Sequence, residues 1–408
     1  MQTLAFLREN LRWLGAGFLL SLSSSFGQTF FISLFSRDIR ETFGLSDGDF
    51  GWLYSTATLA SALTLVWLGK LADSKPLAPL SAISTAGLAL VALGMAAVAS
   101  PVMLVVVLYG LRLFGQGMMT HLCFTAMGRW YNAQRGRAIA VAAMGLPAGE
   151  ALFPIVAVSL MLWIGWRETW VVAAGTLMLV SLPLGWVLLR HGRTPRSPAP
   201  AAGDKSYKIQ VRDWTRGQVM RDPLFYALMP GILAPSFIIT GVLFHQVHLV
   251  EIKGWSLALF AAAYPGLAVS AVGASLAFGW AIDRWSAGRL LPAYLLPMAA
   301  GLVLLGLEDA PWTALGFMVL SGVTAGAGTT LLGALWAEIY GTRHLGGIRA
   351  LAVAATVAAS GLAPGIMGGL LDLGVGLEAQ ILVMAVYSLA AAGLFTALAR
   401  GTDRLAQA

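Results

Sequence analysis

Charged residues and cysteines are scarce in this sequence of 408 residues. Only 11% of the residues are Asp, Glu, Lys or Arg, against about 25% in a typical soluble domain, and 58% are hydrophobic. These proportions exclude a soluble globular protein. The single cysteine, Cys123, excludes an internal disulfide framework, and no Cys/His cluster has the spacing of a zinc site. We therefore expect neither a bound metal ion nor any other cofactor.

The short motifs of common enzymes are also missing. The sequence has no nucleotide-binding loop ending in Gly-Lys-Ser/Thr, no Gly-x-Ser-x-Gly and no His-Glu-x-x-His. Neither ATP-driven nor hydrolase chemistry is expected, and we predict that the protein is not an enzyme. The net charge of +7 comes from cations in short loops that form no contiguous basic face. Nucleic acid is therefore not an expected partner.

Apolar runs of membrane-spanning length are what the sequence has in abundance. A helix needs about 20 mostly apolar residues to cross a bilayer core. Twelve such runs lie at roughly 13–35, 50–72, 78–99, 101–128, 137–161, 167–189, 223–249, 256–282, 289–307, 312–337, 346–371 and 377–399. The sequence predicts an all-α membrane protein with twelve transmembrane helices embedded in the lipid bilayer.

The longest polar interruption, rich in Pro, Ala and charge, lies almost at the centre of the chain. It predicts two six-helix bundles, residues 1–190 and 223–408, joined by a cytoplasmic linker at 191–222. If both termini are cytoplasmic, most of the 26 Lys and Arg residues fall on the cytoplasmic side, as the positive-inside rule requires. We expect a multi-pass protein of a bacterial inner membrane with this orientation.

The two predicted halves also resemble each other. An offset of 210 to 211 residues superimposes several pairs, namely Ser25 on Ser236, Phe26 on Phe237, Thr29 on Thr240, Tyr54 on Tyr264, Gly69 on Gly279 and Asp73 on Asp283. Because each half has an even number of helices, this repeat is parallel. Transporters built from two pseudo-equivalent halves show such repeats.

Two copies of one motif carry a resemblance to a known family. After the second predicted helix the chain reads Gly-Lys-Leu-Ala-Asp from Gly69 to Asp73, and after the eighth it reads GWAIDRWSAGR from Gly279 to Arg289. Both resemble the signature of the major facilitator superfamily, although the first copy lacks the trailing Gly-Arg-Arg. The resemblance implies a secondary carrier with alternating access around a midplane site between its halves.

The fourth helix and the connection that follows it add a second resemblance. The run YGLRLFGQGMM, from Tyr109 to Met119, resembles the superfamily's Arg-x-x-x-Gly-x-Gly pattern, and RWYNAQRGRAIAVAAMG, from Arg129 to Gly145, resembles its connection between the fourth and fifth helices. This second run is also similar to the bacterial monocarboxylate and oxalate/formate porter branch of the superfamily. The Asp and Arg pair that is typical of the eighth helix in animal monocarboxylate carriers is absent. The branch implies a small organic anion as the substrate.

The repeated motif predicts a cytoplasmic gate. Glycine allows helices to approach closely, and an aspartate at a helix end can bond to a neighbouring helix N-terminus or to an arginine. The predicted gating residues are Gly69, Asp73, Gly279, Asp283, Arg284 and Arg289. For the cations of the first copy, the alternative is a solvated loop charge on the cytoplasmic side.

Two ionisable residues are predicted near the bilayer midplane, where a charge is costly and usually faces a cavity or a partner. Arg112 lies in the fourth predicted helix and Glu150 in the fifth, at similar depth. Their repeat counterparts are Val323 and Leu362, so the scaffold does not demand these charges. We expect Arg112 to bind an anion and Glu150 to exchange a proton. The alternative is a permanent buried pair that fixes two helices.

Further polar residues are candidates for hydrogen bonds to the substrate or for proton transfer. They are Gln28, Gln116, Ser25, Ser236, Tyr264 and His245. The two serines are equally typical of helix contacts, and Tyr264 would offer an aromatic hydroxyl. His245, near the predicted outer surface, is either a proton carrier or a residue of the outer gate.

We therefore predict a secondary active transporter that takes up a small, monocarboxylate-like anion together with protons, acting as a monomer. The alternative is a proton-driven exporter of lipophilic or cationic compounds, with Glu150 as the cation partner. A membrane sensor without transport is a third possibility, which the lack of an appended signalling domain disfavours.

Overall fold

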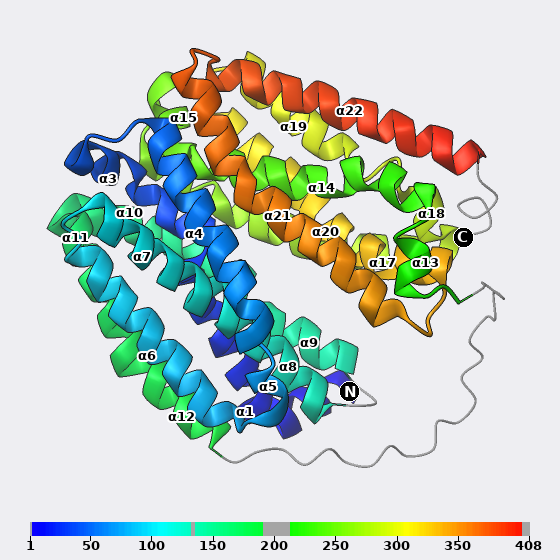
Figure 1. Cartoon of the computed structure of the whole chain (residues 1–408), viewed down its shortest axis with the longest axis horizontal. Coiled ribbons are helices and arrows are strands. Elements are labelled where there is room, and N and C mark those ends of the chain that lie inside the picture. Colours follow the sequence, from blue (N-terminus) through cyan, green and yellow to red (C-terminus); the bar gives the residue numbers. More distant parts are fainter. Residues whose placement is uncertain (1, 132–134, 191–212, 402–408) are drawn as a thin grey trace. The chain divides into compact units, whose positions relative to one another are not determined.

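The computed structural model describes residues 2–131, 135–190 and 213–401, and within these ranges every regular element is a helix (Figure 1). The side chain of Asp73 lies outside the described part of the structure. The chain divides into two compact units. Unit 1 comprises Met1–Ser46 and Trp52–Asp204, and unit 2 comprises Asp47–Gly51 and Lys205–Ala408.

Nine helices among the described residues are long and apolar enough to cross a membrane, and a bent pair, Phe6–Gly27 with Thr29–Phe43, adds a tenth. These ten match ten of the twelve predicted runs. The run at 50–72 forms a 22-residue helix that carries several hydroxyl side chains. The run at 289–307 is divided, and its longer helix, Leu296–Leu307, has only 12 residues.

Unit 1 begins with a helix that the hydropathy pattern predicts to be continuous but that is interrupted at its middle. Its helices in chain order are α1 (Gln2–Ser23), η1 (Ser24–Gly27), α2 (Thr29–Ile32), η2 (Ser33–Phe35), α3 (Ser36–Phe43), most of α4 (Asp47–Leu68), α5 (Leu71–Ser74), α6 (Leu77–Ala96), α7 (Pro101–Leu111), η3 (Arg112–Met119), α8 (Thr120–Trp130), α9 (Arg135–Ala143), α10 (Gly145–Ile164), α11 (Trp166–Thr176), η4 (Leu177–Ser181) and α12 (Leu182–Leu189). Within this unit α1 packs on α8, α9 and α10, and α6 packs on α11 and α12 (Figure 1).

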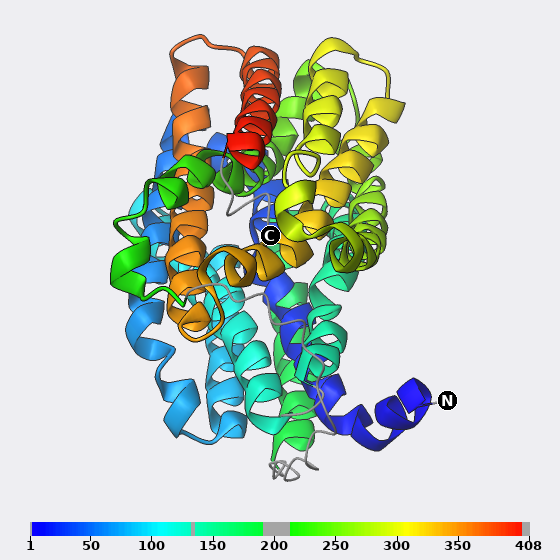
Figure 2. The same ribbon diagram turned by 90° about the vertical axis from the view of Figure 1, so that its right-hand side faces the viewer.

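Unit 2 contains longer uninterrupted helices. They are α13 (Arg216–Val219), α14 (Pro223–Phe244), α15 (Gln246–Ile252), α16 (Leu257–Ala261), α17 (Tyr264–Trp285), α18 (Ala287–Leu290), α19 (Leu296–Leu307), α20 (Trp312–Tyr340), α21 (Leu345–Asp372) and α22 (Leu377–Gly401). Within this unit α17 packs on α20, α14 on α21, and α19 on both α20 and α22 (Figures 1 and 2). Gly326 allows the α17–α20 contact, because a Cβ there would collide with the carbonyl oxygen of Ala271.

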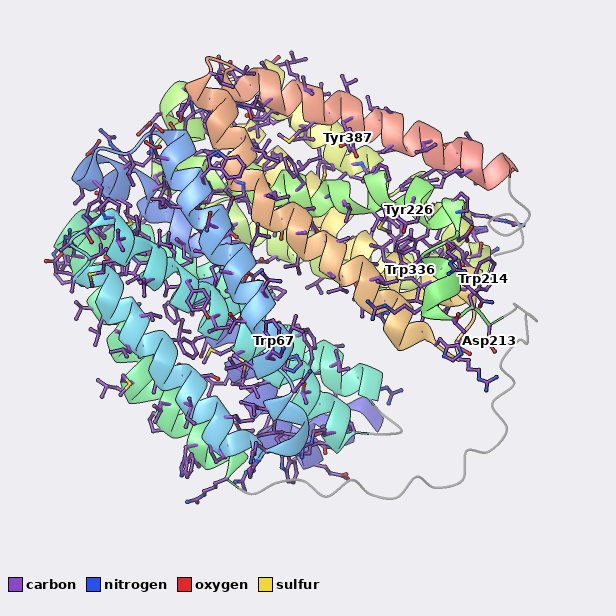
Figure 3. The ribbon with its side chains drawn as sticks, in the orientation of Figure 1. Trp67, Asp213, Trp214, Tyr226, Trp336 and Tyr387 are labelled. Carbon is purple, nitrogen blue, oxygen red and sulfur yellow. The ribbon has the colours of Figure 1, made fainter. Side chains whose placement is uncertain are left out.

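The described end of the predicted linker folds onto unit 2. The Asp213 carboxylate accepts backbone N–H bonds from Thr342 and Arg343, both at 3.1 Å, and Trp214 donates its backbone N–H to the Tyr340 carbonyl at 3.0 Å. Figure 3 shows Asp213 and Trp214 beside Trp336 at this end of the unit. Residues 191–212 lie outside the described residues, so the linker prediction stays open there.

Large apolar side chains cover the outside of the helices in both units. Leu162, Trp163, Leu179 and Leu276 are 80%, 83%, 79% and 73% exposed. In water such a surface would aggregate, whereas a bilayer solvates it. The pattern fits helices that face lipid.

Candidate transport site

The centre of unit 1 is built where two irregular helical segments touch. η1 ends at Gly27, and the extended backbone of the next residue, Gln28 (φ −87°, ψ 155°), breaks the first span. η3 is a π-helical segment that begins at Arg112. A Cβ on Gly115 would lie 2.6 Å from the Gly27 Cα, so only glycine fits at this crossing. Irregular turns of this kind expose backbone groups and are frequent at functional sites.

Arg112 is buried at this crossing, with only 2% of its surface exposed. Its Nη1 donates to the carbonyl oxygen of Gly27 at 2.9 Å, a carbonyl that the helix break leaves available. The guanidinium carbon lies 5.2 Å from the centre of the Tyr54 ring, which is cation–π distance. Nε is buried without a hydrogen-bond partner. Among the described residues no carboxylate pairs with this cation.

The break is also held from the other side. Tyr54 is fully buried and donates its hydroxyl to the Thr29 Oγ1 at 2.8 Å, directly after Gln28. Sequence reasoning did not select Tyr54 or Thr29 as site residues, although the internal repeat had marked both. The half-buried amides of Gln28 and Gln116 have no hydrogen-bond partner among the described residues.

Glu150 lies on α10, which packs against this part of the first span. A Cβ on the preceding residue, Gly149, would collide with the Ser25 Oγ, so the two backbones are close. Ser25 is buried, and its hydroxyl has no hydrogen-bond partner in the part of the chain that the structure describes. The Glu150 side chain is half-buried and makes no ion pair or hydrogen bond with any described residue. Arg112 and Glu150 therefore do not form the buried pair that the sequence analysis gave as the alternative, and Arg112 bonds to the Gly27 carbonyl instead.

Unit 2 contains a cavity of about 430 Å³ between α14, α20 and α21. Ser236, predicted as a site residue, lines it, while the other lining hydroxyls were not predicted. They belong to Thr240, Tyr294, Thr324, Thr329 and Thr356. Arg349 of α21 is the one cation among the described residues that line the cavity. The remaining wall is apolar, so the cavity suits a ligand with a few polar groups.

The other two predicted residues of unit 2 lie at a different place. Tyr264 begins α17 and donates its hydroxyl to the Gln246 Oε1 at 3.0 Å, and both side chains are completely buried. His245 lies between α14 and α15 and is 2% exposed. The structure does not bring these residues into the cavity. They belong to the end of unit 2 that carries α15, which we call the α15 end.

Lys253 anchors an ion-pair cluster at the α15 end. Its side chain is 1% exposed, and Nζ lies 2.5 Å from carboxylate oxygens of both Asp309 and Glu378. Burial lowers the pKa of Lys253, but the hydrogen bonds to Asp309 and Glu378 and their negative charges outweigh it, so the pKa is raised above its usual value. The cluster ties α15 to the α19–α20 loop and to the start of α22.

The first copy of the predicted gating motif is held through its backbone. The carbonyl of Gly69 lies 3.0 Å from the His121 Nε2, and Arg129 Nη1 donates to the carbonyl of Ala72 at 2.8 Å and to that of Lys75 at 3.3 Å. Arg129 of α8 thus holds the connection between α4 and α6 through two backbone carbonyls. The gating role of Asp73 stays a prediction, since its side chain lies outside the described residues.

The second copy is held by an acid instead. Glu338 of α20 accepts the backbone N–H of Ala287 at 2.9 Å and that of Gly288 at 3.3 Å, just after Ser286, whose φ is +75°. Asp283 and Arg289 are exposed, Gly279 has ordinary van der Waals room, and Arg284 lies over the rings of Trp280 and Trp285. The sequence analysis did not select Glu338. The signal that could have found it is an acidic residue near the end of an apolar run.

Comparisons with known proteins bear on the fold. The family model described as Major Facilitator Superfamily matches residues 17–307. No curated protein sequence matches this chain. A solved structure of a bacterial homologue of the human lysosomal transporter Spinster, inward-facing and occupied, is similar over 96% of this chain and 97% of that chain, with a TM-score of 0.72 and 18% identity. The inward-facing, unoccupied conformation is similar over 95% of this chain and 96% of that chain, with a TM-score of 0.69 and 17% identity.

Proposed function

Because this chain belongs to the Major Facilitator Superfamily, we propose that it is a secondary transporter that moves a small organic anion together with protons. The twelve-helix, all-α membrane fold predicted from the sequence is confirmed by the family match and by the structural similarity. Members of this family are multi-pass membrane transporters of small molecules and not enzymes. The anion, the proton and the residues that handle them are our proposal.

The environment of Arg112 is the observation that carries the anion assignment. A buried cation without a carboxylate is costly, and the partners of Arg112 among the described residues are one backbone carbonyl and one aromatic ring. A carboxylate that reached the free Nε edge would supply the missing charge and accept a charge-assisted hydrogen bond. Gln28 and Gln116 would add neutral hydrogen bonds to the same ligand.

Glu150 is our proposed proton carrier. Its half-buried carboxyl has no described cation or hydrogen-bond donor that would hold it ionised. A carboxyl in such surroundings binds and releases a proton as its contact with water changes. The α10 helix, which carries Glu150, packs on the first span, and the Gly27 carbonyl of that span accepts the Arg112 hydrogen bond. A movement of the helix break at Gln28 can therefore displace both Arg112 and Glu150. Protonation of Glu150 would then accompany the arrival of the anion.

The setting of this transporter follows the charge pattern of the sequence. We propose that it acts as a monomer in a bacterial inner membrane, with both termini in the cytoplasm and the α15 end outside. A proton gradient directed into the cytoplasm would then drive uptake. The motif connections held by Arg129 and Glu338 would lie on the cytoplasmic side, where we propose that the six motif residues act as a gate.

The internal pH of proteoliposomes tests this function. A panel of small carboxylates is added outside, with empty liposomes as one control and the Glu150→Gln variant as the other. We expect acidification that depends on the protein, that occurs with one class of acid, and that falls at least tenfold in Glu150→Gln, because an amide cannot carry the proton. Exchange of labelled anion across the membrane should persist in this variant.

The same vesicles test the alternative function. If no carboxylate moves protons and a lipophilic cation releases them from the vesicle interior, the protein is a proton-driven exporter. Glu150 would then bind the cation.

A further inference from the structure

A pocket of about 410 Å³ lies at the end of unit 1 where α6 begins and α12 ends. Arg129 of α8 and Arg190, the residue that follows α12, both line it. No acidic side chain is among the described residues of its wall. Two guanidinium groups on the wall of one pocket repel each other, and an anion bound between them replaces this repulsion by two attractions. The pocket is therefore suited to an anionic ligand.

Both arginines have hydrogen-bond donors that the described part of the chain does not use. Nη1 of Arg129 donates to the carbonyls of Ala72 and Lys75, whereas its Nε and Nη2 make no hydrogen bond with a described residue. The side chain of Arg190 makes no hydrogen bond or ion pair with a described residue. A guanidinium group donates two parallel N–H bonds, a geometry that matches two oxygens of a phosphate group. Phosphate is thus the anion that this pair fits best.

The first turn of α6 lines the same pocket. Leu77 and Ala78 are the first two residues of this 20-residue helix, and no side chain of the preceding residue, Pro76, caps it. The backbone N–H groups of Leu77 and Ala78 bond to no described residue. The N-terminal end of a helix carries a partial positive charge, which adds to the attraction that the two arginines exert on an anion.

The pocket adjoins an apolar surface on α12. Trp186 lines the pocket and is 45% exposed, and Leu184 and Val187 of the same helix are exposed as well. Trp130 forms another part of the wall. Tryptophan is enriched where a membrane meets water, at the depth of the lipid headgroups. This surface favours a phosphate that belongs to a lipid over a free ion, because acyl chains can cover the exposed side chains of α12.

We propose that this pocket binds the phosphate group of an anionic phospholipid between Arg129 and Arg190, with the acyl chains of the lipid on α12. Arg129 contacts the phosphate through Nε and Nη2 while its Nη1 keeps the bonds to the α4–α6 connection. The lipid thereby joins the first copy of the repeated motif to the bilayer. The site does not depend on the transported anion, on Glu150 or on which end of unit 1 faces the cytoplasm.

Native mass spectrometry of the full-length protein tests the site without a transport assay. The protein in detergent is titrated with phosphatidylglycerol and, separately, with phosphatidylcholine of the same acyl chains. We expect phosphatidylglycerol to bind at least tenfold more tightly, because the choline group of the other lipid carries a positive charge that the arginines repel. A large excess of inorganic phosphate should leave phosphatidylglycerol bound. Displacement by inorganic phosphate would show that the pocket takes a free ion and would overturn the lipid assignment.

Variants of single arginines locate the bound lipid. Arg190→Gln should weaken phosphatidylglycerol binding about five- to tenfold, as expected for one basic side chain beside a lipid phosphate. Arg129→Gln should weaken it at least as much, but it also loses two bonds to the α4–α6 connection, so Arg190→Gln is the cleaner variant. Arg137→Gln removes the same charge at an exposed position of α9 outside the pocket and should bind as the wild type does. The proposal is wrong if the wild type does not prefer phosphatidylglycerol, or if Arg190→Gln and Arg137→Gln have the same affinity.

Discussion

The two units use one helical scaffold but place their charges differently. Unit 1 carries Arg112 and Glu150 at its centre, beside a broken helix. Unit 2 has Val323 and Leu362 at the repeat-equivalent positions and a cavity lined mainly by hydroxyl and apolar groups. Its buried cation, Lys253, lies at the α15 end in a cluster of ion pairs. The shared part of the repeat therefore specifies the fold, and the unshared charges point to function.

The connections that carry the repeated motif show the same contrast. In unit 1 a cation, Arg129, donates to backbone carbonyls at the end of the motif. In unit 2 a carboxylate, Glu338, accepts from backbone N–H groups at the start of a short helix. Both side chains bond to backbone groups that helix ends leave unsatisfied. Arg129 bonds to carbonyl groups, the negative end of the peptide dipole, and Glu338 bonds to N–H groups, the positive end. The two connections are thus held by side chains of opposite charge.

Replacing the central arginine should have the largest effect. Arg112→Met should lower anion uptake at least 100-fold, because losing a charge-assisted bond in a buried site costs about 3 kcal/mol or more. Arg349→Met, at the cavity of unit 2, should lower it less than tenfold. Uptake of labelled anion into proteoliposomes measures both. Equal losses in the two variants would remove the functional difference between the units.

The helix crossing of unit 1, where Gly115 packs on Gly27, should not tolerate a residue larger than glycine. Gly115→Ala places a Cβ against the backbone of Gly27, which cannot move aside as a flexible side chain would. We expect a loss of about 2–3 kcal/mol in the free energy of unfolding, the upper part of the range for overpacked cores. Gly128→Ala is the matched control, since nothing lies within 4 Å of its Cβ.

The corresponding crossing of unit 2 sharpens the comparison. Gly326→Ala should be as destabilising as Gly115→Ala, because its Cβ meets the Ala271 carbonyl. Gly333→Ala in the same helix has open space and should be neutral or slightly stabilising. Thermal unfolding in detergent gives all four values. If Gly326→Ala is harmless, close glycine packing is a property of one unit only.

The ion-pair cluster should contribute to the stability of unit 2. Lys253→Met should cost about 1–2 kcal/mol, less than a fully buried pair, because Asp309 and Glu378 are 75% and 46% exposed. Lys70→Met, at an exposed lysine, is the control. Since the pKa of Lys253 is raised in the fold, this stabilisation is complete below the unfolded value of about 10.4 and is lost as the pH rises through the folded value. The difference between wild type and Lys253→Met should therefore shrink at strongly alkaline pH, and a difference that grows there would contradict the cluster's role.

A single hydroxyl in the cavity of unit 2 should have the smallest effect. Ser236→Ala should weaken anion affinity about two- to tenfold, as expected for one neutral hydrogen bond of about 0.5–1.5 kcal/mol. Ser159→Ala, whose exposed hydroxyl bonds to its own helix, should leave affinity unchanged. Competition between labelled and unlabelled anion gives the affinities. A larger loss than in Arg112→Met would move the main binding site to unit 2.

Hydropathy located the helices well but not their interruptions. Ten predicted runs coincide with helices long enough to span a membrane, because a run of about twenty apolar residues is typical of a transmembrane helix. The break at Ser24–Gln28 and the π-helical segment from Arg112 lie within apolar runs, where neither hydropathy nor helical period changes. The two irregular segments touch at Gly27 and Gly115, which are far apart in the sequence.

The same limit applies to the candidate site. The cost of a buried charge drew attention to Arg112, and a permanent pair with Glu150 on a neighbouring helix was the alternative to an anion-binding role. The actual partners, the Gly27 carbonyl and the Tyr54 ring, are a backbone group and an aromatic side chain. Such partners leave no charge pattern in the sequence. The roles of Gln28, Gln116 and Ser25 remain predictions.

The position of a bound anion tests the central claim most directly. Crystals grown with a brominated analogue of the transported carboxylate would locate the ligand by the anomalous scattering of bromine. We predict that the carboxylate lies at hydrogen-bonding distance, about 3 Å, from the guanidinium of Arg112. A carboxylate found at Arg349 or elsewhere in the cavity of unit 2, with Arg112 still bonded only to Gly27, would contradict the account.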